Sequence, residues 1–136
     1  MNNLVATAGA PAGLREHAAG GRIACAAHEP LQQALFAATE DGRLVGVGVD
    51  TGDLVLEAPL PAPGAVIAVH ALAELDVVFV ATADGALLLM HLDTEAWETV
   101  GEMEGGLLAA SCSPDGELLV CLTRTLTLVE LSTSSW

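Results

Sequence analysis

Residues 105–131 read GGLLAASCSPDGELLVCLTRTLTLVEL, and the prediction of the fold rests on this stretch. It predicts three short strands, at residues 107–111, 117–121 and 125–131, which are separated by two turns. In the first turn, Ser113-Pro114-Asp115-Gly116, proline presets a negative φ and glycine accepts a positive one. The last strand alternates threonine with aliphatic residues, which is the period of a half-buried strand. The stretch is therefore predicted to form a β-meander.

The same meander occurs twice more, upstream of this stretch. The apolar runs that open the units begin near Ile23, Val66 and Leu107, at spacings of 43 and 41 residues. A repeat of about 40–45 residues with four strands per unit is typical of WD-repeat β-propeller blades. We therefore predict an all-β fold, a partial β-propeller of about two and three-quarter four-stranded antiparallel blades. The turns that match one another contain Asp41-Gly42, Asp84-Gly85 and Arg124.

The repeat divides the chain into a leading segment and three units. Residues 1–22 form an N-terminal segment, in which residues 3–8 are expected to supply a ring-closing strand. WD-repeat-like blades then occupy residues 23–136, as units 23–63, 64–104 and an incomplete 105–136. A propeller closes only with about four to eight blades, so further blades or other subunits are needed to close the ring. The chain is therefore expected to be a piece of a longer protein. The strands expected in the first two units cover residues 23–27, 34–38, 43–49, 53–58, 65–71, 77–81, 87–92 and 97–100.

Composition and charge restrict the partners of this chain. Eighteen acidic residues stand against four arginines and no lysine, which gives a formal net charge of −14. Such a surface repels phosphate backbones, so direct nucleic-acid binding by this acidic segment is not expected. No run approaches the roughly 20 apolar residues of a membrane-spanning helix, and the N-terminus lacks the features of a secretory signal. We expect a soluble protein with a solvated acidic surface, and a docking surface for a basic partner is the alternative.

No catalytic, cofactor-binding or metal site is predicted, and no cofactor is expected. The histidines show no ligand spacing, the cysteines form no CxxC pair, and the serines lack a GxSxG elbow. The glycines of VGVGVD lie in a strand with no helix after it, so they do not form a dinucleotide-binding turn. Trp97 is expected to pack between blades. The residues weighed are His17, His28, His70, His91, Cys25, Cys112, Cys121, Ser111, Ser113, Gly46 and Gly48.

The acidic residues of the turns also point to structure rather than to chemistry. Asp41, Asp84 and Asp115 occur once per unit, which indicates turn formers rather than a catalytic pair. Glu102 and Glu104 are expected to be solvated on a blade edge. Acidity alone therefore identifies no site.

The segment Val77–Thr123 resembles the N-terminal propeller of the largest Elongator subunit, the scaffold also called IKAP. The order of features is similar to that family: an apolar strand, a Gly turn, an aliphatic strand, a Val-Gly strand, a Gly-rich link and Ser-Pro-Asp. The Gly-His and Trp-Asp dipeptides of WD repeats are absent, and Val49-Asp50 stands where Trp-Asp would close a strand. The matching residues are Ala81-Thr82, Asp84-Gly85, Val100-Gly101, Gly105-Gly106 and Ser113-Pro114-Asp115.

This resemblance implies a non-catalytic scaffold segment of a complex that modifies wobble uridines of tRNA. Its partners would be other Elongator-type subunits, and its location the cytoplasm, with the nucleus as a second place. Two alternatives stand beside it: an unrelated WD-repeat adaptor, and the first part of a propeller enzyme. The enzyme would need polar residues on the innermost strands, whose sequences IACAA, AVIAVHA and LLAAS contain one histidine and no carboxylate.

Overall fold

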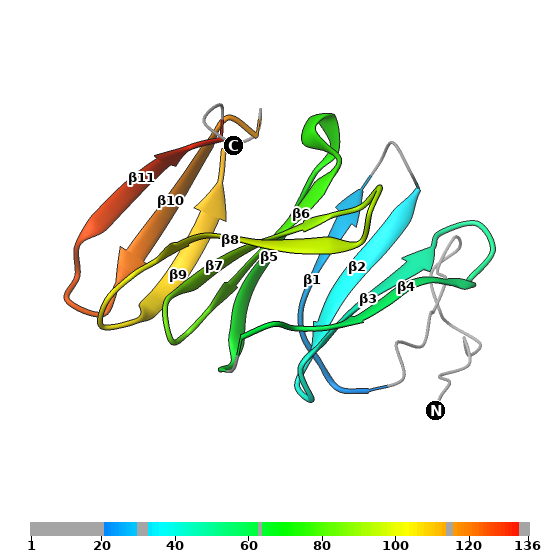
Figure 1. The fold of residues 1–136 in the computed structure, drawn as a ribbon, viewed down its shortest axis with the longest axis horizontal. Helices are drawn as coiled ribbons and strands as arrows, with labels where there is room; N and C mark the ends of the chain where they lie inside the picture. Colours follow the sequence, from blue (N-terminus) through cyan, green and yellow to red (C-terminus); the bar gives the residue numbers. More distant parts are fainter. Residues whose placement is uncertain (1–20, 30–32, 63, 114–115, 134–136) are drawn as a thin grey trace, which may run out of the picture.

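The computed structural model describes residues 21–29, 33–62, 64–113 and 116–133, and the ring-closing strand predicted at residues 3–8 lies outside them. Within these ranges the chain forms three antiparallel sheets of four, four and three strands, each with its strands in sequence order. Figure 1 shows the three sheets side by side along the molecule. The prediction of an all-β partial propeller is confirmed.

Each sheet is called a blade here. Blade 1 contains β1 (Ile23–Glu29), β2 (Ala34–Thr39), β3 (Arg43–Gly48) and β4 (Leu54–Pro59). Blade 2 contains β5 (Val66–Leu72), β6 (Val77–Thr82), β7 (Ala86–His91) and β8 (Ala96–Glu102), with the 3-10 helix η1 (Ala73–Leu75) after β5. Blade 3 contains β9 (Leu107–Cys112), β10 (Leu118–Thr123) and β11 (Leu128–Ser132).

The first strands of the blades lie next to one another. β1 contacts β5, and β5 contacts β9. Two polar contacts join these strands: the Cys25 thiol approaches the carbonyl oxygen of Val66 at 3.7 Å, and His70 Nε2 lies 3.5 Å from the carbonyl oxygen of Ala110. β1, β5 and β9 are therefore the inner strands of the partial ring.

Alternate side chains of each strand point to opposite faces of its sheet, and each blade packs on the next through them. The face of each blade that packs on the following blade is called its forward face here, and the opposite face its backward face. The forward face of blade 1, which includes Phe36 and Leu44, packs on Val80 and Met90 of blade 2. The forward face of blade 2, which includes Phe79, packs in the same way on blade 3. The core thus consists of two layers between blades rather than one central mass. The buried forward-face residues on the second and third strands are Ala34, Phe36, Ala38 and Leu44 in blade 1, and Val77, Phe79, Ala81, Leu87 and Leu89 in blade 2.

A threonine at the end of the second strand stabilises the following turn in every blade. The hydroxyl oxygens of Thr39, Thr82 and Thr123 each accept a hydrogen bond from the backbone N–H four residues later, at 3.1 Å. These threonines are 43 and 41 residues apart, the same spacing as the opening strands. This repeated residue was not identified from the sequence alone.

The turn of blade 3 differs from the others and corrects one predicted strand. Gly42 and Gly85 adopt φ of 88° and 104°, whereas the equivalent Leu126 adopts φ of 65°. Residues 124–127 are therefore a turn, and β11 begins at Leu128 rather than at Thr125. The Thr-Leu alternation was misleading because threonine hydroxyls hold this turn: Thr123 Oγ1 lies 2.9 Å from Thr125 Oγ1.

All three inner strands contain a β-bulge at the same place. The register with the second strand shifts between Ile23 and Cys25, between Val66 and Ala68, and at Leu107 opposite Thr123. The extra residue bends the inner strand and increases its local twist. The equivalent bulges show that the three blades share one backbone design.

Candidate interaction surfaces

The described histidines are dispersed and make separate contacts. His70 stacks on Phe79, with ring centroids 6.3 Å apart, on the inner strand β5. His91 lies at the end of β7, where its Nε2 is 2.8 Å from Glu98 Oε1 of β8. His28 is exposed on β1, and His17 lies outside the described residues. Among the described residues, no group of three His, Cys, Asp or Glu side chains could hold a metal ion.

The inner strands are more polar than the sequence predicted. β1 extends to Glu29, two residues beyond the predicted end at Ala27, and so includes His28 and a carboxylate. The Glu29 side chain is buried, with only 1% of its surface exposed. The expectation that the inner strands contain no carboxylate is therefore wrong. Because Glu29 is buried at the end of the strand, it does not present its carboxylate at an open surface.

Asp41 forms part of a hydrogen-bonded group at the outer corner of blade 1. Its carboxylate accepts hydrogen bonds from the Thr39 hydroxyl and from Arg43 Nε, the latter at 3.2 Å to both oxygens. Arg43 Nη1 also donates to Glu57 Oε2 of β4 at 2.5 Å. The Thr39 hydroxyl, followed by Arg43, lowers the pKa of Asp41, and Asp41, followed by Glu57, raises the pKa of Arg43. The group links the turn to the outer strand, and it is a structural arrangement.

The other turn aspartates do not form an equivalent set. Asp84 occupies the position of Asp41 in the turn between β6 and β7, but the equivalent residue in blade 3 is Thr125. Asp115 belongs to a different hairpin, between β9 and β10, and lies outside the described residues. In that hairpin, the Ser113 hydroxyl oxygen accepts a hydrogen bond from Leu118 N at 3.0 Å, so Ser113 stabilises the turn.

The predicted packing residues have structural roles. Trp97 of β8 packs against the core between blades 1 and 2, as expected. Gly46 lies in β3, where an added Cβ would be 2.8 Å from the Phe36 ring, so glycine leaves space for that ring. Cys25, Cys112 and Cys121 are not joined in disulfides. Burial raises the pKa values of Cys25 and Cys121, which keeps these thiols in their protonated, unreactive form.

The forward face of blade 3 is an exposed apolar surface. Leu118 and Leu128 are 38% and 71% exposed, whereas Leu87, the blade 2 equivalent of Leu128, is fully buried. Leu108, at the bulge position of β9, is also exposed, and its equivalent Ile67 packs into the core between blades 2 and 3. An exposed apolar patch of this kind marks a surface for contact with another protein element.

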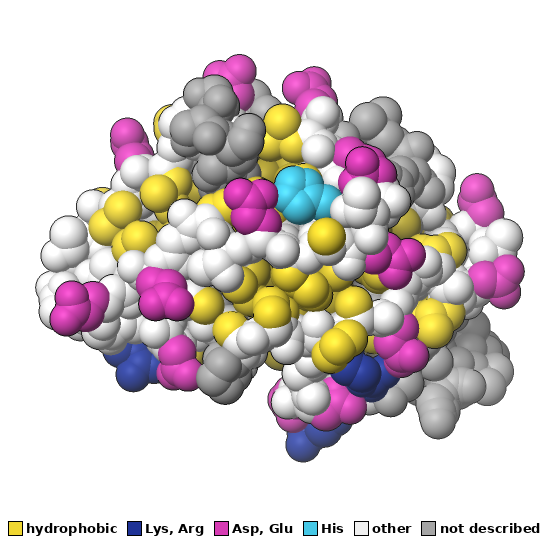
Figure 2. Space-filling model, viewed as in Figure 1, with side chains coloured by type: hydrophobic (Ala, Val, Ile, Leu, Met, Phe, Trp, Pro, Cys, Tyr) yellow, Lys and Arg dark blue, Asp and Glu magenta, His cyan; other side chains and the backbone are white. Residues whose placement is uncertain are grey.

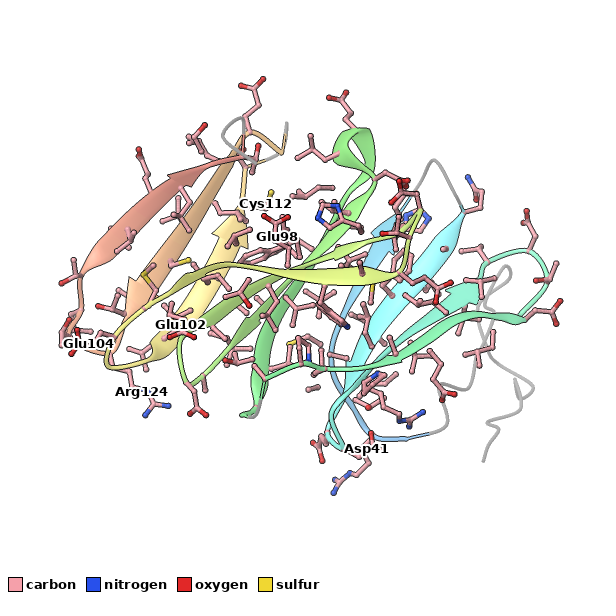
Figure 3. The ribbon with its side chains drawn as sticks, viewed as in Figure 1. Asp41, Glu98, Glu102, Glu104, Cys112 and Arg124 are labelled. Atoms are coloured by element: carbon pink, nitrogen blue, oxygen red, sulfur yellow. The ribbon has the colours of Figure 1, made fainter. Side chains whose placement is uncertain are left out.

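The outer surface is acidic. Figure 2 shows Asp and Glu side chains scattered around the visible face, hydrophobic side chains across its middle, and Arg side chains only toward its lower border. Glu102 and Glu104 are exposed at and just beyond the end of β8, as expected. In Figure 3, Arg124 points away from both of these glutamates. Among the described residues, the chain forms no helix with the length and apolarity needed to cross a bilayer.

Comparisons with known proteins place these blades in a family. The family model described as the ELP1 first N-terminal beta-propeller matches residues 21–136. Elongator complex protein 1 of Mus musculus is 36% identical over 81 residues, which cover 58% of this chain and 6% of that protein. Elongator complex protein 1 of Rattus norvegicus and of Oryctolagus cuniculus are each 35% identical over 81 residues, with the same coverage.

The matched region corresponds to a small part of each relative, since 6% of their length is aligned. It includes all three blades, because the family model begins at residue 21, two residues before β1. The resemblance to the largest Elongator subunit is thereby confirmed, and the alternative of an unrelated WD-repeat adaptor is not supported. The chain belongs to the family of the first N-terminal β-propeller of Elongator complex protein 1.

Proposed function

We propose that this chain is a non-catalytic scaffold segment of an Elongator-type complex that acts in the modification of tRNA wobble uridines. The family match over residues 21–136 is the observation that carries this proposal. The chemistry of the complex would reside in another subunit. The part played by this chain is to present rigid blades as a platform for protein–protein contact.

Several features of the structure support a platform role. The three blades pack through extensive apolar layers, which makes them a rigid support. The described histidines, cysteines and turn carboxylates are separate from one another or are engaged in structural contacts. The partners would be other Elongator-type subunits, together with the blades or subunits that complete the ring.

The acidic surface makes direct contact with tRNA by this segment unfavourable. A formal net charge of −14 would repel the phosphate backbone, and a protein that binds RNA needs basic side chains along its contact surface. We therefore propose that the segment contributes to tRNA modification through its protein partners. Its proposed location is the cytoplasm, where the modification would take place.

The test replaces the equivalent segment of a cellular Elongator complex protein 1 with this chain. The readouts are the fraction of modified wobble uridines, measured by mass spectrometry of tRNA nucleosides, and the subunits that co-purify with the tagged protein. We expect the replacement to retain both. Phe79→Asp, which places a charge in the core between blades 2 and 3, should abolish both, and Glu98→Gln on the exposed outer strand should change neither.

A second comparison separates a scaffold from an enzyme. If the chain is a scaffold, we expect that replacing the inner-strand histidines His28 and His70 by alanine leaves the modification of tRNA intact as long as the subunits still co-purify. Loss of modification with full retention of the subunits would contradict the non-catalytic role. Failure of the wild-type segment to recover any Elongator subunit would contradict the proposed function as a whole.

A further inference from the structure

The turn between β10 and β11 contains an arginine and an exposed threonine at a distinctive spacing. Arg124 precedes Thr127 by three residues, and Thr127 is exposed. Protein kinases choose substrates partly by charge pattern, and an acidic substrate groove favours arginine at this spacing before the acceptor. The other arginines of the chain are followed at that spacing by residues without a hydroxyl: Ala18 after Arg15, Cys25 after Arg22 and Gly46 after Arg43.

The geometry of the turn leaves the Thr127 hydroxyl accessible. The backbone of Thr127 is held by Thr123: its N–H donates to Thr123 Oγ1 at 3.1 Å, and its carbonyl oxygen accepts from Thr123 N at 3.0 Å. The Thr127 hydroxyl itself lies 3.4 Å from Thr125 Oγ1, on the solvent side of the turn. Arg124 is also exposed, and Figure 3 shows it projecting away from the sheets.

Local opening of this turn costs less than opening of the equivalent turns. Leu126 holds a left-handed φ of 65°, a conformation that is unfavourable for L-residues with a side chain. β11 pairs only with β10 within the described residues, and Figure 1 places their turn at one extremity of the molecule. A kinase cleft that binds an extended segment could therefore accommodate residues 124–128 after limited fraying.

We propose that Thr127 is a phosphorylation site for a serine/threonine kinase that selects arginine three residues before the acceptor. The Thr127 hydroxyl oxygen attacks the γ-phosphorus of ATP, an O–P bond forms, and the bond to the bridging oxygen of the β-phosphate breaks. ADP leaves, and the hydroxyl proton passes to the base of the kinase. Arg124 provides the recognition charge.

Phosphorylation would change the charge at one repeated position of the blades. The equivalent of Thr127 is Arg43 in blade 1, which binds Asp41 and Glu57, and Ala86 in blade 2. A phosphate adds a charge of about −1.5 to −2 and accepts strong hydrogen bonds. The Thr125 hydroxyl and the Arg124 guanidinium are the nearest candidate donors from the same turn. Phosphorylation would thus place a negative charge at the position that Arg43 fills with a positive charge in blade 1.

The test incubates the folded 136-residue chain with ATP and a purified arginine-directed kinase, validated on a peptide with arginine three residues before threonine. Intact-mass measurement follows the addition of one phosphoryl group, and tandem mass spectrometry locates it. We expect phosphorylation at Thr127, its loss in Thr127→Val, and a rate about tenfold lower in Arg124→Gln, since a charge-assisted contact to the kinase is removed. Thr125→Val should retain phosphorylation at Thr127.

The other outcomes overturn the proposal. Phosphate on Thr125 or another residue with Thr127 unmodified would assign the site elsewhere. Phosphorylation of a peptide of residues 117–133 without phosphorylation of the folded chain would show that the fold protects Thr127. An unchanged rate in Arg124→Gln would remove Arg124 as the recognition residue. Circular dichroism of each variant confirms that the comparison is made on folded protein.

Discussion

The threonine at the end of each second strand is the residue on which the blade turns depend. Thr82 is fully buried, and its hydroxyl oxygen is the acceptor for Ala86 N at 3.1 Å. Valine has the same shape but cannot accept this hydrogen bond, so Ala86 N would be left without its partner. The repeated threonine therefore couples the second strand of a blade to the third.

We predict that Thr82→Val lowers the free energy of unfolding by about 1–2 kcal/mol, the cost of an unsatisfied buried donor. Urea denaturation monitored by circular dichroism measures this difference. Thr99→Val on the exposed face of β8 serves as the control and should change stability by no more than about 0.5 kcal/mol. Equal effects of the two substitutions would contradict the role of the Thr82 hydroxyl.

Asp41 makes the stability of blade 1 depend on pH. The Thr39 hydroxyl and Arg43 lower the pKa of Asp41 below its ordinary value of 3.8 in the folded state. The folded state therefore favours the ionised carboxylate, and this stabilisation is fully present above the ordinary value and is lost as the pH falls through the folded value. The side chain is exposed, so solvent screens the interaction.

We predict that wild type is more stable than Asp41→Asn at neutral pH and that the difference shrinks as the pH falls below 3.8. Urea midpoints measured across this range provide the test. In a Thr39→Val background, which removes the first cause of the shift, the pH-dependent part of the difference should decrease. A difference between Asp41 and Asn that stays constant with pH would contradict this account.

At the scale of the element, the glycine turns show why equivalent positions are not interchangeable. A Cβ added to Gly85 would lie 2.1 Å from the carbonyl oxygen of Met103, whereas a Cβ at Gly42 would meet no atom within 4 Å. The hydrogen bond at this position does not account for the difference, because Met103 N donates to the Gly85 carbonyl oxygen at 2.7 Å and Leu60 N donates to the Gly42 carbonyl oxygen at 2.9 Å. Both glycines have positive φ, so only the close approach distinguishes them.

Gly85→Ala is therefore predicted to lower the free energy of unfolding by about 2–4 kcal/mol. The backbone of Met103 must move away from the new Cβ, and the alanine must also adopt a strained φ. Gly42→Ala should cost only about 1–2 kcal/mol, the cost of the left-handed conformation alone. Thermal and urea denaturation of the two variants compare them directly. A larger loss for Gly42→Ala would show that the Met103 contact does not restrict Gly85.

Most strands could be predicted from the sequence because Gly, Asp and Pro interrupt the apolar runs. Residues 125–127 could not, since the Thr-Leu alternation suits a strand, while three threonine hydroxyls and a left-handed Leu126 form a turn there; residues 128–131 are in β11 as predicted. Glu29 was also missed, because the predicted strand ended at Ala27, two residues before the end of β1. The threonine repeat was visible in the sequence, but its importance depends on hydrogen bonds that only the structure shows.

At the scale of the whole molecule, the exposed forward face of blade 3 governs behaviour in solution. We predict that the isolated 136-residue polypeptide self-associates at micromolar concentration through this apolar face and along β11, which is an edge strand among the described residues. Leu128→Asp should reduce this association and leave the melting temperature little changed, since Leu128 is 71% exposed. Light scattering and thermal melts measure the two effects.

The matched control for this prediction is Leu87→Asp, at the equivalent position of blade 2. Leu87 is fully buried, so a charge there should unfold the protein rather than only dissociate its oligomers. A sharp monomeric wild-type species at all concentrations would contradict the prediction. Increased association of Leu128→Asp would place the contact on another surface.

The forward and backward faces of the blades also have a consequence for synthesis on the ribosome. Blades 2 and 3 each pack on the preceding blade. A blade that leaves the ribosome can therefore pack on one that has already folded, so folding can proceed from the N-terminus one repeat at a time. At about 5–20 residues per second, a repeat of 43 residues takes roughly 2–9 s to appear. During that interval the apolar forward face of the most recently folded blade is exposed to solvent, and this is the period in which a molecular chaperone would protect the most apolar surface.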